Sequence, residues 1–241
     1  MIDERHGNIA NTMLPEGRSM EFQTPKVVAD YMASLMPDGY QTIASGNTSH
    51  AEGSGTTALG TASHAEGWVT TAYGYSSHAE GTSTLASGQY SHAEGASNIA
   101  SGLASHAEGG LTTAIGSYSH AEGNSNIASG FISHAEGYLT TAIGDYSHAG
   151  GYNSIASGSS TFIHSTNSRV TGARSAVLGG QNITGTSTDT VYVPDFVIKK
   201  AASIPTSSAD SVGEPGSITW DNTYFYWKTN TGWLRILGVA F

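Results

Sequence analysis

The chain has 241 residues, of which 31 are glycine and only 12% are charged, and its formal net charge is −10. Because cysteine is absent, a disulfide scaffold, thiolate chemistry and cysteine zinc sites are excluded. With 9 Lys and Arg against 19 Asp and Glu, the composition argues against nucleic-acid binding. The first residues show no basic stretch followed by an apolar run, and no apolar stretch approaches the length of a membrane span. We therefore expect neither a signal peptide nor membrane insertion.

Residues 1–40 are expected to form a short helical segment. Thr24 and Pro25 are suitable as the N-cap and first residue of a helix, and Pro37-Asp38-Gly39 ends it. Between them, one apolar face is formed by Val27, Val28, Tyr31, Leu35 and Met36. We expect this segment to cap the domain that follows or to attach the chain to a larger particle.

Residues 41–185 contain a short tandem repeat of constant length. The pentapeptide Ser-His-Ala-Glu-Gly begins at Ser49, Ser63, Ser77, Ser91, Ser105, Ser119 and Ser133, and an eighth copy at Ser147 has Gly150 in place of Glu. A second glycine series, from Gly46 to Gly172, runs in the same period. This period is too short for a pair of helices, which needs about 33 residues. Each half-repeat alternates and ends in glycine, which predicts an all-β fold with one strand–turn–strand–turn coil per repeat. Coils stacked about 4.8 Å apart would form a β-solenoid roughly 45 Å long.

Alternation assigns the side chains of each coil to two faces. Ser, Ala and Gly of the pentapeptide share the face expected to point inward, and His and Glu share the outward face. The second sheet is expected to project one large apolar residue per coil, namely Leu59, Tyr73, Leu85, Ile99, Ile115, Ile127, Ile143 and Ile155. A roll filled with Ser and Ala buries too little apolar surface to fold alone. We therefore expect association with other copies to cover this row.

Ser-x-Ala-x-Gly, with glycine turns repeated at this fixed spacing, resembles the YadA-like head repeat of trimeric autotransporter adhesins, over residues 41–185. The resemblance implies a homotrimer of left-handed parallel β-rolls. Those repeats usually have aliphatic residues where this chain has His and Glu, and residues 175–179 (Ser-Ala-Val-Leu-Gly) return toward that pattern. We expect neither the signal peptide nor the C-terminal membrane segment that an autotransporter needs. The Ser-His-Ala-Glu-Gly variant instead looks like a phage tail-fibre or virion-appendage protein.

Residues 186–241 differ in composition and are expected to form a small β-hairpin module. Strands are predicted at 191–193, 196–198, 216–227 and 232–236, with turns at Asp221-Asn222 and Thr229–Gly232. The pattern is similar to small β-modules at the ends of many phage fibre proteins.

The His and Glu rows are expected to be structural, and we predict no enzyme activity, no cofactor and no metal. An active site is one constellation, whereas the pentapeptide recurs in identical copies, and its Ser and His point to opposite faces. Three histidines around a threefold axis would suit Zn or Ni, but a hydrogen-bonded ladder is the simpler interpretation. Its members are His50, His64, His78, His92, His106, His120, His134, Glu52, Glu66, Glu80, Glu94, Glu108, Glu122 and Glu136. Because no Lys or Arg occurs between Lys26 and Arg169, we expect the glutamates to raise the pKa of these histidines more than burial lowers it.

Exposed aromatic residues are the candidate receptor contacts, with ordinary structural cover as the alternative. They are Trp220, Tyr224, Tyr226, Trp227 and Trp233 in the C-terminal segment, and Tyr90, Tyr118 and Tyr146, which recur in every second repeat. The predicted protein is a homotrimeric phage tail fibre, made in the host cytoplasm and located in the virion. Its partners would be other virion proteins and a host surface glycan or protein. The alternatives are a structural head fibre, spike or cap without receptor binding, and a fragment of a cellular adhesin.

Overall fold

The computed structural model describes residues 41–194, 207–209, 211, 215–220 and 224–237, and the chain divides after Pro194 into two compact units. Within these ranges the regular structure consists of strands, with no helix. The predicted all-β fold is therefore confirmed. The helix predicted at 25–36 and the strand predicted at 196–198 lie outside the described residues.

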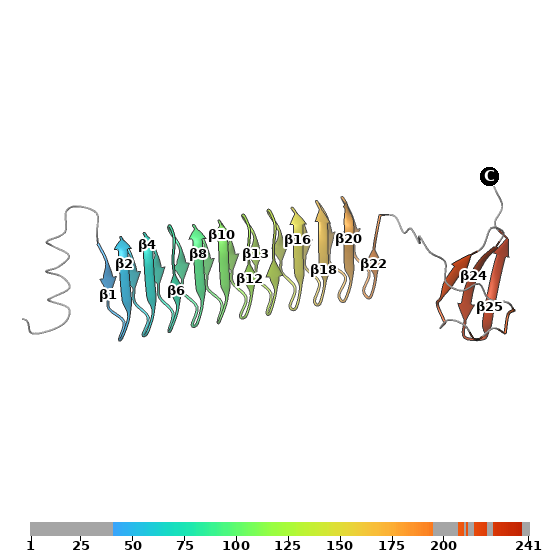
Figure 1. The fold of residues 1–241 in the computed structure, drawn as a ribbon, viewed down its shortest axis with the longest axis horizontal. Helices are drawn as coiled ribbons and strands as arrows, with labels where there is room; N and C mark the ends of the chain where they lie inside the picture. Colours follow the sequence, from blue (N-terminus) through green and yellow to red (C-terminus); the bar gives the residue numbers. More distant parts are fainter. Residues whose placement is uncertain (1–40, 195–206, 210, 212–214, 221–223, 238–241) are drawn as a thin grey trace, which may run out of the picture. The chain divides into compact units, whose positions relative to one another are not determined.

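The first unit is a parallel β-solenoid of two sheets, each with eleven strands (Figure 1). The sheet that we call the odd sheet consists of β1 (Ile43–Ala44), β3 (Thr57–Ala58), β5 (Thr71–Ala72), β7 (Leu85–Ala86), β9 (Ile99–Ala100), β11 (Thr113–Ala114), β13 (Ile127–Ala128), β15 (Thr141–Ala142), β17 (Ile155–Ala156), β19 (Arg169–Val170) and β21 (Thr184–Gly185). The even sheet consists of β2 (His50–Ser54), β4 (His64–Trp68), β6 (His78–Ala79), β8 (His92–Ala96), β10 (His106–Gly110), β12 (His120–Ala121), β14 (His134–Ala135), β16 (His148–Tyr152), β18 (Phe162–Thr166), β20 (Ala176–Gln181) and β22 (Val191–Tyr192). The chain alternates between the two sheets, so each coil contributes one strand to each.

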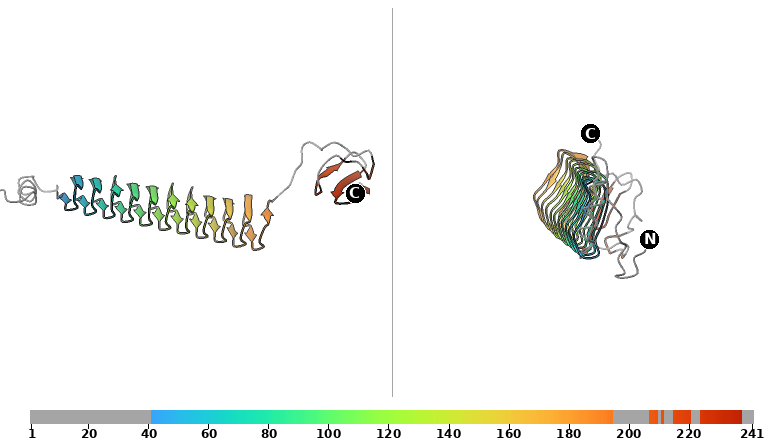
Figure 2. Two further views of the ribbon diagram at one scale, coloured as in Figure 1. Left: turned by 90° about the horizontal axis from the view of Figure 1, so that it is seen from below. Right: turned by 90° about the vertical axis from the view of Figure 1, so that its left-hand side faces the viewer.

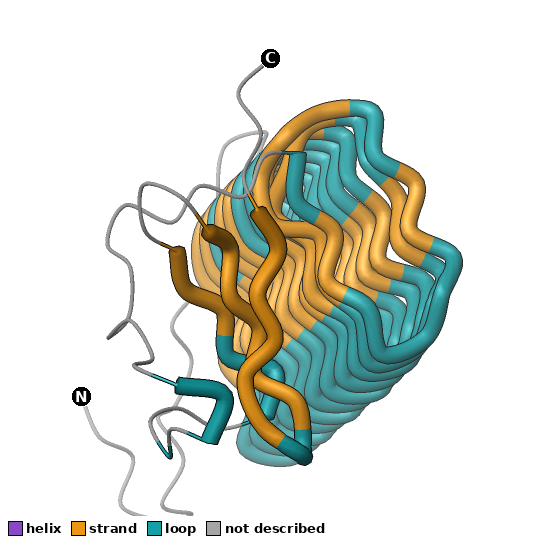
Figure 3. The backbone as a smooth tube through the Cα atoms, turned by 90° about the vertical axis from the view of Figure 1, so that its right-hand side faces the viewer, coloured by secondary structure: helices purple, strands orange, loops and turns teal. Residues whose placement is uncertain are grey.

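Successive coils are paired in register, so that each residue lies beside its counterpart in the next repeat. His106 pairs with His120, for example, and Thr113 with Ile127. Viewed along the roll, the coils superimpose (Figures 2 and 3). The last coil contains one extra residue, and β20 pairs with β22. Residues 191–192 therefore belong to the roll, whereas the sequence analysis placed them in the C-terminal module.

The interior of the roll is filled by the small side chains that alternation assigns to it. Every seventh residue from Ala58 to Ala156, taken alternately from the odd and the even sheet, is a fully buried alanine, and Ile163, Val170 and Val177 continue this series in the last coils. The glycine of the pentapeptide does not share this inward face. Gly67, for example, is exposed and has a φ of 105° although it lies within β4 and pairs with Gly53, and this positive φ breaks the alternation of inward and outward residues.

Many buried polar groups in this thin interior form hydrogen bonds, whereas the hydroxyls of Thr56, Thr70, Ser119 and Ser147 have no such partner among the described residues. The Ser63 hydroxyl donates to the Gly60 carbonyl at 2.7 Å, and the same bond recurs at Ser77, Ser91, Ser105 and Ser133. Asn98 links two coils: its Nδ2 donates to the Gly109 carbonyl, and its Oδ1 accepts from the Thr112 amide, both at 2.8 Å. These bonds allow a core with little apolar volume to remain ordered.

The second glycine series marks a corner where backbones approach closely. A Cβ atom placed on Gly116 would lie 1.9 Å from the carbonyl oxygen of Gly130 in the next coil. The same overlap occurs at Gly60, Gly74 and Gly88. Steric exclusion of a side chain therefore explains why glycine recurs at this position of the repeat.

The second unit contains a three-stranded antiparallel sheet of β23 (Ile218–Trp220), β24 (Tyr224–Thr229) and β25 (Gly232–Leu237). The predicted turn between Thr229 and Gly232 joins β24 to β25, and the turn predicted at Asp221-Asn222 lies outside the described residues. The amide of Trp233 donates to the carbonyl of Ser208 at 2.9 Å, which places residues 207–209 against β25.

Candidate functional site

The even sheet presents a continuous stack of histidine rings. From His64 to His134, successive rings lie nearly parallel with centroids 4.8–4.9 Å apart. This stack follows from the register, because each histidine pairs directly with the histidine one coil away.

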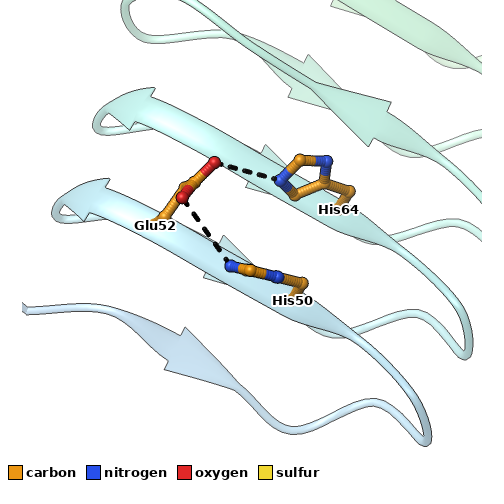
Figure 4. Close-up of side chains that lie close together, drawn as sticks. All are labelled: His50, Glu52 and His64. Atoms are coloured by element: carbon orange, nitrogen blue, oxygen red, sulfur yellow. Dashed lines mark ion pairs between the residues drawn. The ribbon is translucent and has the colours of Figure 1, made fainter.

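Each interior histidine contacts the glutamate of the preceding coil. The Nε2 atom of His92 lies 3.2 Å from Oε1 of Glu80, and that of His134 lies 3.1 Å from Oε1 of Glu122. At the first coil, Glu52 lies between His50 and His64, at 3.8 and 3.7 Å (Figure 4). Apart from the contact between His50 and Glu52, the contacts thus join successive coils and do not link the His and Glu of one pentapeptide.

The pKa of His120 is lowered from its ordinary value of 6.5, chiefly by burial and then by the positive charges of His106 and His134. Glu122 and Glu108 act in the opposite direction but do not compensate. The pKa of His148 is also lowered, again mainly by burial. The expectation that glutamates raise the histidine pKa is therefore wrong at both positions, because the stack adds like charges and removes water.

This direction predicts that the folded protein loses stability in acid. A base whose folded-state pKa lies below its unfolded value contributes full stability above about pH 6.5 and loses it as the pH falls through the folded pKa. We expect the melting temperature to fall between pH 8 and pH 5, and to fall less in His120→Gln. Thermal melts followed by circular dichroism would measure this, and a melting temperature that rises on acidification would reverse the conclusion.

Aromatic side chains gather at adjoining corners of the coils. Tyr90, Tyr118 and Tyr146 are more than half exposed and have φ near 58°. Tyr118 and Tyr146 make edge-to-face contacts with Phe131, with centroids 5.9 and 5.6 Å away, and Tyr90 contacts Tyr75 similarly. One side of each tyrosine ring therefore covers a neighbour, and the remainder is accessible.

The C-terminal aromatic residues are divided between two faces of their sheet. Tyr226 and Trp233 are buried, and Tyr224 lies under the Arg235 guanidinium, 4.5 Å from its ring centroid. Trp227 is 51% exposed on the opposite face, between its cross-strand neighbours Ile218 and Leu234.

That opposite face also includes Phe225 and the half-buried Trp220. The sequence analysis did not separate the two groups of aromatics and did not identify Ile218, Phe225 and Leu234. Because alternate residues of a strand point to opposite faces, counting outward from the predicted turn at Thr229–Gly232 could have separated the two groups.

The outer side of the odd sheet carries an apolar row. Ile115 and Ile143 are 51% and 47% exposed, and the row continues through Leu59, Tyr73, Leu85, Ile99, Ile127 and Ile155, which range from half-buried to exposed. In each coil of the odd sheet, two outward positions flank a buried alanine, as in Thr113-Ala114-Ile115. Coils with threonine before the alanine have Leu, Tyr or Ile after it, whereas coils with Ile or Leu before the alanine have serine after it. One large apolar group per coil is thereby maintained along the row.

Comparison with known families identifies the repeat. Residues 38–67 and 135–161 match the model of the YadA head domain repeat. The roll contains YadA head domain repeats. These repeats indicate an adhesin-like fibre fold, with His and Glu on the outward side of the even sheet. A search of curated proteins found no match to the chain. Among the described residues, no helix has the length and hydropathy of a membrane span.

Proposed function

We propose that this chain forms a homotrimeric fibre of a bacteriophage particle and contacts the host cell surface. The observation that most strongly supports the trimer is the exposed apolar row on a roll whose own interior is almost entirely Ala, Ser and Thr. YadA-type heads form trimers, and three copies around a common axis would bury such a row. We further propose that the chain is a binding protein without enzymatic activity.

The contact surface proposed for the host is the exposed apolar face of the C-terminal sheet. It consists of Ile218, Phe225, Trp227 and Leu234 beside Trp220. Exposed aromatic groups of this kind can stack on sugar rings or fill a pocket of a surface protein. The tyrosines at the roll corners offer a second, more dispersed set of rings.

Adsorption of particles tests this proposal. Antibody against the roll should label the particles, and particles carrying Trp227→Ala should adsorb to host cells about tenfold more slowly, as expected for a central aromatic contact. Leu111→Ala, which shortens an exposed side chain at a corner of the roll, is the matched control and should adsorb normally.

Two outcomes would count against the proposal. If the antibody does not label the particles, the chain is not an exposed component of the virion. Normal adsorption by particles in which Trp227, Tyr90, Tyr118 and Tyr146 are all replaced by alanine would favour the alternative, a structural head fibre, spike or cap.

A further inference from the structure

The histidine–glutamate ladder changes at its C-terminal end. Gly150 replaces the glutamate of the eighth pentapeptide, and His164 stands one coil later in the same row, paired with Gly150. The row that is otherwise glutamate therefore ends with Glu136, a glycine and a histidine.

This replacement brings two imidazoles onto one carboxylate. Oε1 of Glu136 lies 3.2 Å from Nε2 of His148 and 3.6 Å from Nδ1 of His164. Each interior glutamate from Glu66 to Glu122 has one histidine within 4 Å, among the residues that the structure describes. Glu52 also has two, but at longer distances and with greater exposure.

Gly150 makes the space in which these groups meet. A Cβ atom on Gly150 would lie 2.7 Å from Nδ1 of His164 and 3.0 Å from Oε1 of Glu136. Gly150 is buried, and its φ does not require glycine. The missing side chain therefore lets His164 reach across one coil toward Glu136.

The ring of His148 is oriented toward the same point. It stacks on Phe162 with centroids 4.7 Å apart and meets His134 edge-on, unlike the parallel rings before it. Its Nε2 atom is shielded from solvent, as are those of His64, His106 and His120, and it lies close to Oε1 of Glu136. His148 is 24% exposed and His164 is 58% exposed, so the cluster is open on the side of His164.

We propose that Glu136, His148 and His164 bind one divalent transition-metal ion, with Zn²⁺ as the best fit. Two imidazoles and a carboxylate are borderline ligands of the kind that zinc prefers. In a tetrahedral zinc site with bonds of about 2.1 Å, ligand atoms lie about 3.4 Å apart, close to both measured separations. The fourth position would be occupied by water. The site is formed within one chain, and metal binding would tie together three coils at the end of the ladder.

Zinc titration of the untagged full chain tests the proposal. Isothermal calorimetry should show one Zn²⁺ per chain with micromolar or tighter affinity, and Co²⁺ should give the visible absorption of a tetrahedral complex. His164→Ala should weaken binding at least tenfold, and Gly150→Ala should do the same without removing a ligand. His92→Ala, which removes a histidine from the interior of the ladder, should bind as the wild type does.

Circular dichroism would establish that each variant keeps its fold. The exposed His164 can be replaced with little structural effect, so His164→Ala remains informative even if Gly150→Ala disturbs the coil. The proposal is wrong if the wild type binds no zinc, if binding survives His164→Ala, or if His92→Ala weakens it equally.

Discussion

Replacing Ile115 and Ile143 together by aspartate is expected to abolish assembly of the fibre. Both side chains are about half exposed on the single roll and belong to the apolar row of the odd sheet. Full burial of an isoleucine contributes about 1.5–3 kcal/mol, and a trimer would lose six such side chains. The aspartates would also place unpaired carboxylates in the contact, where desolvation opposes association. Sedimentation velocity should show a small or aggregated species in place of the trimer.

Two control variants separate the effect of the added charge from the effect of the lost apolar contact. Asn124→Asp with Asn153→Asp adds the same number of charges at exposed positions outside the apolar row and should leave the trimer intact. Ile115→Val with Ile143→Val should do so as well. A double aspartate variant that still sediments as a trimer would show that the row does not form the contact between chains.

Replacing Gly116 by alanine is expected to destabilise the roll severely. The new Cβ would lie 1.9 Å from the Gly130 carbonyl oxygen, a backbone atom that can move only if the two coils separate. Because the overlap interrupts pairing within a continuous sheet, we expect a loss of about 4 kcal/mol or more, at the upper end of single substitutions. For a chain of this size, that corresponds to a melting temperature lower by about 8–16 °C.

Gly110→Ala is the matched control for this substitution. Gly110 pairs with Ala96 of the preceding coil, and a Cβ on Gly110 has the Asn124 Nδ2 atom at 3.1 Å as its nearest neighbour. Its melting temperature should stay within a few degrees of the wild type. Equal melting temperatures for the two alanine variants would contradict the steric explanation for the second glycine series.

The sequence was sufficient to predict the roll because its repeat has a fixed period and strict alternation. The constant period defines the coil, and alternation places Ala65 inside and His64 outside. The glycine of the pentapeptide was misplaced because its positive φ, 105° at Gly67, interrupts the alternation within the strand. The repeat gives no signal for the extra residue near the end of the roll. The prediction that residues 191–192 (β22) belong to the C-terminal module was therefore also wrong.

The electrostatic and functional features depend on quantities that spacing does not provide. The direction of the His120 pKa depends on whether burial and neighbouring imidazoles outweigh two glutamates, which the sequence alone does not determine. The cluster at Glu136 depends on side-chain orientation around Gly150, although the sequence shows that the repeat is broken there. The division of the C-terminal aromatics between two faces required the register of β24 with β25.

Sedimentation velocity of the wild-type chain at neutral pH is the most direct test of the proposed fibre. The proposal predicts one elongated species with three times the chain mass of 24.9 kDa, and no folded monomer on dilution. A folded, monodisperse monomer would contradict it, because the exposed apolar row would then be stable in water without a partner.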